Sequence, residues 1–482
     1  MRENLRNRIA KMPMAMVIIP FATGIFLADM AELSIWLLLL ACFISLVGVV
    51  VLDKWWQNFA LFVLIFMTGS LLHSISYRGE IEYNKPYEME LKVDSSSVRR
   101  DGYTSAQAKI ERCQNPNFVN RKVVLWGDSL TTFKAGDRLH ITTSVRPFKA
   151  KHEQYARLMH HRGFVGSISV NHRSRYGYIP AERETMHDWA VGRLRGAMSE
   201  GDSRAIVLAM VTGERGEISE ELRQNYSASG ASHLLAVSGL HIGIAFILIN
   251  LLLLPLVLVR YGNILRSLLA MASIWAYVWL CGSSPSAIRA AIMFSVLQLS
   301  LASLREYVSV NVLAATAFVM LAFDTHLLFD ISFQLSFIAV AGIILWAVPL
   351  YRLCVTRFKI VNTVVAILLV GFSSTLITMP LVANAFSIIS LVGILINPVV
   401  ILLAHIVVLS GIVALAIPII APVAEFTALL QNRIVAWAMA LPYSHFEVTI
   451  SSAMMWGMYA LFAVATILIW VLSDYKRAKK VK

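Results

Sequence analysis

The 482-residue chain is 57% hydrophobic and only 15% charged, whereas soluble domains carry about 25% charged residues. A water-soluble protein of this composition, with a mean hydropathy of +0.67, would expose large apolar patches and aggregate. Soluble, disordered and collagen-like classes are therefore excluded, and the composition predicts a polytopic membrane protein. The net charge is +13.

Apolar runs long enough to cross a bilayer, which takes about 20 residues, lie on both sides of a polar segment at 77–230. They predict an all-α membrane bundle of about twelve spans. The runs are 13–28, 33–52, 57–76, 234–259, 267–281, 286–303, 308–323, 331–350, 361–380, 388–404, 405–421 and 450–472. The stretch 388–421 is the weakest assignment, because it fits either two spans or one span with a re-entrant piece.

The distribution of Lys and Arg sets the orientation, because these residues concentrate in cytoplasmic loops. With the N-terminus inside, the short outer loops hold only Arg433. Both termini are therefore predicted to be cytoplasmic, and the polar segment is predicted to be extracytoplasmic. The chain divides into a three-span region at 1–76, an external domain at 77–180, a linking segment of amphipathic surface helices at 181–230, a second membrane region at 231–472 and a basic cytoplasmic tail at 473–482.

The inserted external domain is predicted to be a small β-barrel. Alternating apolar residues separated by turn signals predict strands at 87–93, 103–111, 121–126, 138–145 and 164–170, and a helix at 154–162. A handful of short strands in about 90 residues favours an OB-like fold, which is small and often binds single strands.

The external domain has an excess of basic residues, which attract phosphates because binding releases counterions. Its aromatic side chains suited to base stacking are Tyr103, Phe118, Trp126, Phe133 and Phe148. Composition alone favours the plainer interpretation, a solvated domain whose aromatic residues form its core. The segments 181–230 and 422–447 are amphipathic, and each is predicted either to lie at the membrane surface or to pack on the bundle.

Residues 229–243 open the fourth span with polar groups, which are costly at membrane depth and usually face a bundle interior or a water path. His233 and His241 share a face if the helix is continuous, but Ser238-Gly239 between them favours a break or a close helix approach. Ser238 and His241 also have the i, i+3 spacing of a catalytic pair. Because no third group orients the histidine, we favour interhelical hydrogen bonding over catalysis.

Two later spans also begin with polar residues. Pro285 follows two serines in an N-cap and N1 pattern, and Arg289 one turn inside either contacts a phosphate in a pore or snorkels to the surface. Asp330 is placed to cap the next span. Gln334 lies one turn deeper, where it either lines a path or bridges helices.

Asn397 and Pro398 are predicted to interrupt a helix in mid-bilayer, as a gate or as a simple kink. No metal site is predicted, because the sequence has no CxxC pair and no acidic residues at ligand spacing beside its histidines. It also has no Gly-x-x-x-x-Gly-Lys-Ser/Thr loop, so energy for transport is expected from a partner.

These motifs resemble the ComEC family of competence membrane proteins. The stretch His-Leu-Leu-Ala-Val-Ser-Gly-Leu-His, residues 233–241, is similar to the family's signature. Further similar stretches follow the family's order at 208–215, 285–290, 330–337 and 397–398. The resemblance extends over nearly the whole chain, to about residue 472.

The resemblance implies transport of single-stranded DNA across the bacterial inner membrane during natural transformation, with the OB-like domain handling the strand. The expected channel or DNA path comprises His233, Ser238, Gly239, His241, Arg289, Gln334 and Asn397, with Pro285, Asp330 and Pro398 as structural positions. Many family members continue into a metallo-β-lactamase-like domain, but this sequence has no His-x-His-x-Asp-His motif. We therefore expect no enzymatic activity and no cofactor, and a separate DNA receptor, nuclease and cytoplasmic motor.

Three points stay open at the level of sequence. A homo-oligomer is compatible with the motifs. The alternative functions are a membrane-embedded hydrolase using Ser238 and His241 and a small-solute transporter. A transporter predicts inverted repeats, and the sequence shows no convincing internal repeat.

Overall fold

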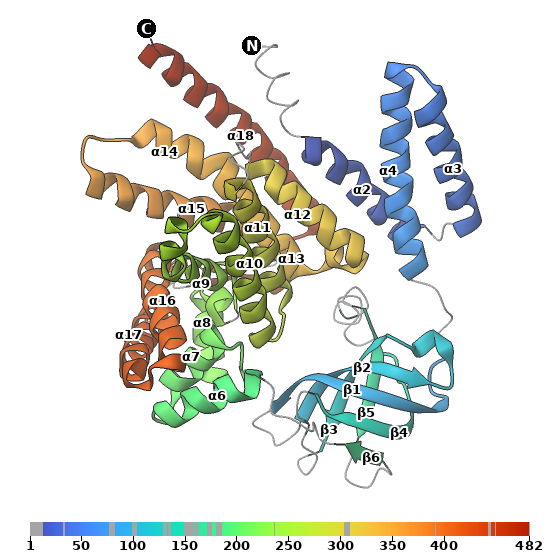
Figure 1. The fold of residues 1–482 in the computed structure, drawn as a ribbon, viewed down its shortest axis with the longest axis horizontal. Helices are drawn as coiled ribbons and strands as arrows, with labels where there is room; N and C mark the ends of the chain where they lie inside the picture. The colour runs from blue at the N-terminus through green and yellow to red at the C-terminus, as the bar shows by residue number, and fades with distance from the viewer. Residues whose placement is uncertain are drawn as a thin grey trace. The chain divides into compact units, whose positions relative to one another are not determined.

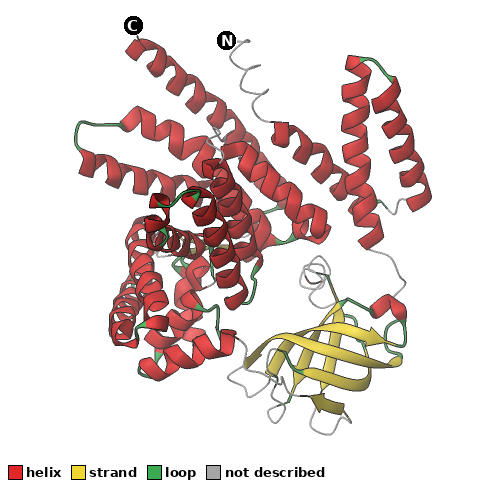
Figure 2. Ribbon diagram, in the orientation of Figure 1, coloured by secondary structure: helices red, strands yellow, loops and turns green. Residues whose placement is uncertain are grey.

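The computed structural model describes residues 13–31, 34–76, 82–98, 104–128, 133, 136–148, 159, 163–170, 176–179, 186–235, 237–302, 309–390, 392–441, 445–448 and 450–481. Most of these residues are helical, and one β-sheet domain accompanies the helices (Figures 1 and 2). The chain splits into two compact units. We call Met186–Thr316 with Ile331–Lys482 the helical unit, and Pro13–Thr185 with Ala317–Asp330 the mixed unit.

The mixed unit begins with three apolar helices: α2 (Pro13–Met30), α3 (Ile35–Val51) and α4 (Lys54–Ser76). Helices α2 and α4 pack so closely that a Cβ on Gly24 would overlap the Phe66 carbonyl, and one on Gly69 would overlap the Phe21 carbonyl. Ser70 Oγ donates a 2.9 Å hydrogen bond to the Gly24 carbonyl. Small residues and interhelical hydrogen bonds of this kind hold helices together where lipid removes the hydrophobic drive.

A buried polar cluster joins the ends of α2 and α4 to the short helix η5 (Thr325–Phe329). His73 is 1% exposed; its Nδ1 lies 3.0 Å from Thr325 Oγ1, and its Nε2 lies 3.4 Å from Asp29 Oδ1. These two contacts place the C-terminal ends of α2 and α4 and the helix η5 on the same side of this unit.

The β-sheet domain has six strands in the order β5-β3-β2-β1-β4-β6. They are β1 (Pro86–Val98), β2 (Thr104–Cys113), β3 (Lys122–Gly127), β4 (Arg138–Ser144), β5 (Phe164–Val170) and β6 (Tyr176–Ile179). Only β3 and β5 are parallel. The sheet curls into a half-barrel, because Arg146 after β4 pairs with Ser167 of β5 through hydrogen bonds of 2.9 and 2.8 Å.

The five predicted strands are confirmed, and β6 is an addition that the sequence pattern did not indicate. One side of the sheet forms a continuous core, in which Leu91, Ala108, Leu125 and Leu139 are fully buried. Alternate residues therefore point inward, as the period of two predicts. The helix predicted at 154–162 lies outside the described residues, apart from one position.

The helical unit carries the polar motifs. Its elements are α6 (Met186–Ala197), α7 (Asp202–Val211), α8 (Glu220–Ala228), η3 (Ser232–Leu235), α9 (Gly239–Leu252), α10 (Gly262–Leu280), α11 (Pro285–Ala302), α13 (Ile331–Gly342), α14 (Val348–Cys354), α15 (Lys359–Phe386), β7 (Ile388–Ser390), α16 (Val392–Ala416), α17 (Ala421–Met439), β8 (His445–Glu447) and α18 (Ser452–Val481). Helix α12 (Ser309–Phe323) runs from this unit into the mixed unit. Across the described chain, eight helices are long and apolar enough to span a bilayer, and four shorter apolar helices accompany them.

The stretch 388–421 follows the alternative with a single helix, with a short strand where a re-entrant piece was predicted. It contains one helix, α16, rather than two spans, preceded by the short strand β7, which pairs with β8. The next helix, α17, is itself long enough to span and packs along α16, so the packing alternative for 422–447 holds. Apolar residues continue through the whole stretch, and for this reason the sequence alone did not locate the turn between α16 and α17.

In the segment at 181–230, the described residues from Met186 onward form α6, α7 and α8, which pack on the other helices of this unit. Residues Ala205–Val211 of α7 are at most 1% exposed, and on α8 the predicted stripe of Leu222 and Tyr226 is buried. Tyr226 donates to Asn432 Oδ1 at 2.8 Å and accepts from Gln431 Nε2 at 2.9 Å, which anchors α8 to α17.

Candidate functional site

The polar motif at 229–243 is not one continuous helix, and within the apolar run predicted at 234–259 the helix α9 begins only at Gly239. Gly230 takes a left-handed φ of 75°, η3 follows, and Ser238 is extended before α9 begins. The break predicted at Ser238 is therefore present. It separates the two histidines: His233 lies exposed on η3, whereas His241 is fully buried in the first turn of α9.

The hydrogen bonding of His241 does not form a serine–histidine pair. Its Nδ1 accepts from the backbone N–H of Ser238 at 3.2 Å, so in the neutral ring Nε2 carries the proton. A ring in this state has no nitrogen left to take a proton from a serine hydroxyl. Both His241 Nε2 and Ser238 Oγ are buried atoms without a hydrogen-bond partner among the described residues.

The start of α11 lies against this motif. As predicted, α11 begins at Pro285 with Ser284 as its cap: the Ala287 N–H donates to Ser284 Oγ at 3.4 Å. Ser286 Oγ donates to the carbonyl of Val237, the residue before Ser238. The serines beside Pro285 therefore do more than cap α11. They also connect the start of α11 to the polar motif at 229–243, which the sequence did not indicate.

Arg289 is 3% exposed on α11, so its side chain lies inside the protein and does not snorkel to a surface. Its guanidinium carbon is 5.4 Å from the centre of the Phe337 ring on α13, within the range of a cation–π contact. Gln334 is half-buried one turn earlier on α13, and Asp330 directly precedes that helix, at the position predicted for a cap.

Asn397 approaches the motif from α16, but it does not interrupt a helix in mid-bilayer. Helix α16 continues through Pro398, although the missing N–H of Pro398 leaves the Ile394 carbonyl without its usual helical donor. Gly393, one turn before Asn397, lies so close to the motif that a Cβ would be 2.5 Å from the Ser229 carbonyl oxygen. Asn397 is 7% exposed, and its Oδ1 is a buried acceptor without a partner among the described residues.

A further histidine that sequence reasoning missed, His405, lies two turns after Asn397 on α16. Both His405 and His233 are near enough to His241 to interact with it electrostatically. His405 Nδ1 donates to the Ile401 carbonyl at 2.7 Å, which leaves its Nε2 as an acceptor when the ring is neutral. The available signal was a histidine in an otherwise apolar span.

The aromatic side chains of the β-sheet domain are mostly core. Phe118 and Phe133 are at most 4% exposed, so they are not available for base stacking, and Phe148 is half-buried. Trp126 on β3 is 36% exposed. Tyr103 lies outside the described residues. The plainer interpretation of these aromatics is therefore correct for Phe118 and Phe133 but not for Trp126.

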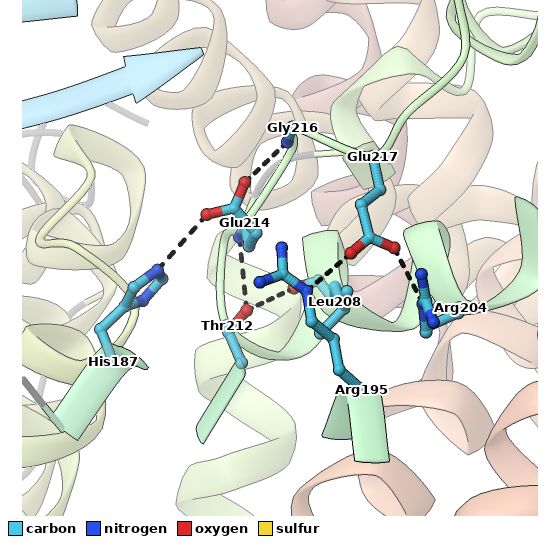
Figure 3. Close-up of polar contacts among 8 residues, drawn as sticks. All are labelled: His187, Arg195, Arg204, Leu208, Thr212, Glu214, Gly216 and Glu217. Atoms are coloured by element: carbon cyan, nitrogen blue, oxygen red, sulfur yellow. Dashed lines mark hydrogen bonds and ion pairs between the residues drawn. The ribbon is translucent and has the colours of Figure 1, made fainter. Parts of the chain in front are cut away.

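An ion-pair network holds the loop between α7 and α8 (Figure 3). His187 Nδ1 donates to the Leu280 carbonyl at 2.9 Å, and its Nε2 faces Glu214 Oε2 at 3.6 Å. Glu214 Oε1 also accepts from the Gly216 N–H at 2.7 Å. This half of the network connects the loop to α6 and to the end of α10.

The other half of the network centres on Glu217, whose two oxygens accept from two arginines (Figure 3). Arg195 Nε lies 2.7 Å from Oε1, and Arg204 Nε lies 2.9 Å from Oε2. Glu214 and Glu217 are each paired with basic side chains of the same unit, so the network is structural. It fixes the segment that leads into the polar motif.

We expect the His187–Glu214 pair to stabilise the protein in a defined pH window. The hydrogen-bonding interaction with Glu214 raises the pKa of His187 above 6.5, and the interaction with His187 lowers the pKa of Glu214 below 4.5. The contribution is full between those ordinary values. It is lost as pH rises through the raised pKa of His187, and as pH falls through the lowered pKa of Glu214.

Thermal melting of the full chain in detergent from pH 4 to 9 measures this window. Glu214→Gln should lower the melting temperature most near pH 5.5 to 6 and progressively less at higher pH. Glu220→Gln, on the exposed face of α8, is the control. A difference between wild type and Glu214→Gln that stays constant across the pH range would contradict the assignment.

Comparisons with known proteins place this chain among its relatives. Residues 210–474, more than half of the chain, match the family described as Competence protein. The chain is 32% identical over 335 residues to an uncharacterized protein of Aquifex aeolicus, across 68% of this chain and 72% of that protein. No solved structure matches.

Two further relatives are matched over smaller shares of their length. ComE operon protein 3 of Bacillus subtilis is 36% identical over 145 residues, which is 30% of this chain and 18% of that protein. The uncharacterized protein YcaI of Escherichia coli is 24% identical over 391 residues, 75% of this chain and 48% of that protein.

The apolar helices, the polar groups buried among them and the β-sheet domain define a multi-pass membrane protein with an internal polar site. The family match and the Aquifex relative then identify its family. The chain belongs to the competence protein family, the ComEC family that its motifs resemble, and it has a role in DNA uptake for competence.

Proposed function

We propose that this protein is a component of the inner-membrane channel that carries single-stranded DNA into the cytoplasm during natural transformation. The observation that carries the proposal is the meeting of three separate motif segments in the helical unit. Ser286 of α11 bonds to Val237, directly before the start of α9, and Gly393 of α16 packs on Ser229, at the end of α8 and the beginning of the same motif.

The chemistry of this meeting point suits a hydrated path. Ser238 Oγ, His241 Nε2 and Asn397 Oδ1 are buried without hydrogen-bond partners among the described residues, and Arg289 is a buried cation. Buried polar groups are nearly always satisfied, so such atoms are places for water or for a passing ligand. A polyanionic strand needs polar or cationic groups along its route, because bare hydrocarbon offers nothing to its phosphates.

The predicted topology of twelve spans with cytoplasmic termini is part of this proposal. The eight long apolar helices and the four shorter ones of the described chain supply the spans, with α16 and α17 taking the place of the two spans predicted at 388–404 and 405–421. The contact of His73 with Asp29 and Thr325 supports the orientation, because the plan puts all three residues at outer ends of their segments. A location in the bacterial inner membrane follows from the family.

The β-sheet domain is proposed to be OB-like. Its curled sheet, the parallel pairing of β3 with β5 and the bridge from Arg146 to Ser167 support a small, partly open barrel. In this proposal the domain faces outward and receives the strand. DNA receptor, nuclease and motor activities are assigned to partner proteins, and no enzymatic role or cofactor is assigned to this chain.

Deletion of the gene followed by complementation tests the proposal. We expect deletion to abolish transformation by labelled donor DNA, and the full chain on a plasmid to restore it. Uptake of DNA into the periplasm should persist in the deletion strain, since only passage across the inner membrane is lost. Normal transformation of the deletion strain would contradict the proposal.

A further inference from the structure

Three lysines from different strands form a row across the β-sheet. The register pairs Lys92 of β1 with Lys109 of β2, and Lys109 with Lys122 of β3. Lys92 and Lys122 are exposed and Lys109 is half-buried, while the residues beside them in the strands point into the core. Because neighbouring strands are about 4.8 Å apart, the row is about 10 Å long. We call Lys92, Lys109 and Lys122 the lysine row.

The lysine row costs stability, because like charges placed directly opposite each other in a sheet repel. Elsewhere on this sheet opposite charges pair: Arg112 Nε lies 3.7 Å from Glu90, and Arg138 Nε lies 3.2 Å from Glu111. In the described chain, none of the three lysines of the row has an ion pair. A sheet that pairs some of its charges directly but sets these three lysines side by side without an ion pair suggests a use for the row other than folding.

Asp94 is the acidic group nearest the row. It lies at a register irregularity of β1, and burial raises its pKa although all three lysines act to lower it. Glu111 of β2, which pairs with Arg138, also acts on Asp94. Three lysines against these two carboxylates leave the local balance positive.

Trp126 lies farther along the same outer face. On β3 it is four residues from Lys122, or about 13 Å along the strand, and on β2 it pairs with Ser105, which alternates with Gln107 and Lys109. Between the cations and the indole this face holds Gln107 on β2, while Val124 on β3 is buried in a small apolar cluster with Phe164. Exposed aromatic groups beside a cationic track are the usual means of holding single-stranded nucleic acid without sequence preference.

We propose that the lysine row binds the phosphates of a DNA single strand and that Trp126 stacks on one of its bases. The proposal rests on the proposed function and names the surface of the β-sheet domain that first holds the strand. A linear row of charges matches a linear polyanion, and the indole distinguishes a nucleic acid strand from an anionic lipid headgroup.

The test uses the full chain in detergent and a fluorescent oligothymidine, with binding measured by anisotropy across salt concentrations. The variant Lys92→Gln/Lys109→Gln/Lys122→Gln should reduce affinity about 10- to 100-fold at low salt. It should also reduce the slope of log K against the logarithm of salt concentration by about 2, since each phosphate contact on a single strand contributes about 0.7 to that slope. Relief of repulsion should leave its melting temperature equal to or above that of the wild type.

The matched control replaces three lysines outside the row, Lys54, Lys85 and Lys359, with glutamine and should bind with nearly the wild-type slope. Trp126→Ala should weaken binding about 5- to 100-fold with the salt slope unchanged, because stacking releases no counterions.

If the lysine-row variant binds oligothymidine as tightly as the control variant, this inference is overturned. The proposed function would still stand if the wild-type chain complements the deletion strain. A wild type that neither binds oligothymidine nor complements the deletion would overturn both. If the lysine-row variant binds phosphatidylglycerol vesicles more weakly than the wild type but binds oligothymidine equally well, the row binds lipid headgroups. That result would also overturn the inference.

Discussion

Replacing Arg289 with glutamine is expected to reduce transformation about 10- to 100-fold in the complementation assay, with the protein still present in the membrane. Hydrogen bonds to charged groups contribute about 1.5–3 kcal/mol, which corresponds to that range. Arg289 is buried at 3% exposure beside Phe337, so its charge lies in the interior of the protein. Glutamine keeps much of the length and removes the charge.

Two further variants separate transport from folding. Arg289→Lys keeps the charge but loses the planar fork, so it should recover part of the activity. Arg357→Gln, which removes an exposed arginine in the loop between α14 and α15, should transform normally. If Arg289→Gln lowers the melting temperature and the amount of protein as much as it lowers transformation, Arg289 has a structural role and the path assignment for it is wrong.

Gly393→Ala is expected to destabilise the helical unit by about 1–3 kcal/mol, the usual cost of overpacking, and to lower transformation with it. The added Cβ would be 2.5 Å from the Ser229 carbonyl oxygen and 3.0 Å from Ser390 Oγ. A carbonyl cannot rotate away as a side chain can, so α16 must move away from the polar motif. Thermal melting in detergent and transformation frequency measure the two effects.

Gly371→Ala is the matched control for this substitution. Gly371 is also a helical glycine, but nothing lies within 4 Å of the position that an added Cβ would take, so alanine should be neutral or stabilising by up to about 1 kcal/mol. Equal behaviour of Gly371→Ala and Gly393→Ala would show that the contact between α16 and the motif is not as close as the structure has it.

Local patterns predicted much of the fold, because spans, strands and caps depend on residues close in sequence. The start of α11 at Pro285 and the break at Ser238 both follow from capping and helix-breaking chemistry. The turn between α16 and α17 could not be predicted in the same way, because Pro418 there follows an apolar run without any charge. Where no charged residue interrupts an apolar run, hydropathy does not show where one helix ends and the next begins.

Features that depend on strand register or helix packing were beyond the sequence. The lysine row joins residues 17 and 13 positions apart in the chain, at 92, 109 and 122, and it appears only once the strands are aligned. The approach of Gly393 to Ser229 likewise depends on tertiary packing. Phe118 and Trp126 look alike in sequence, but their opposite burial follows from the side of the sheet and the loop that each occupies.

The central claim is that the polar groups around Ser238 and Asn397 line a wet route, and cysteine accessibility tests it most directly. In a chain whose native cysteines, Cys42, Cys113, Cys281 and Cys354, are replaced, we expect Ser238→Cys and Asn397→Cys to react with a charged, membrane-impermeant thiol reagent. Single-stranded DNA should slow both reactions. Leu402→Cys, at a position 60% exposed on the apolar surface of α16, should stay unreactive. If positions 238 and 397 are as unreactive as position 402, the account is contradicted.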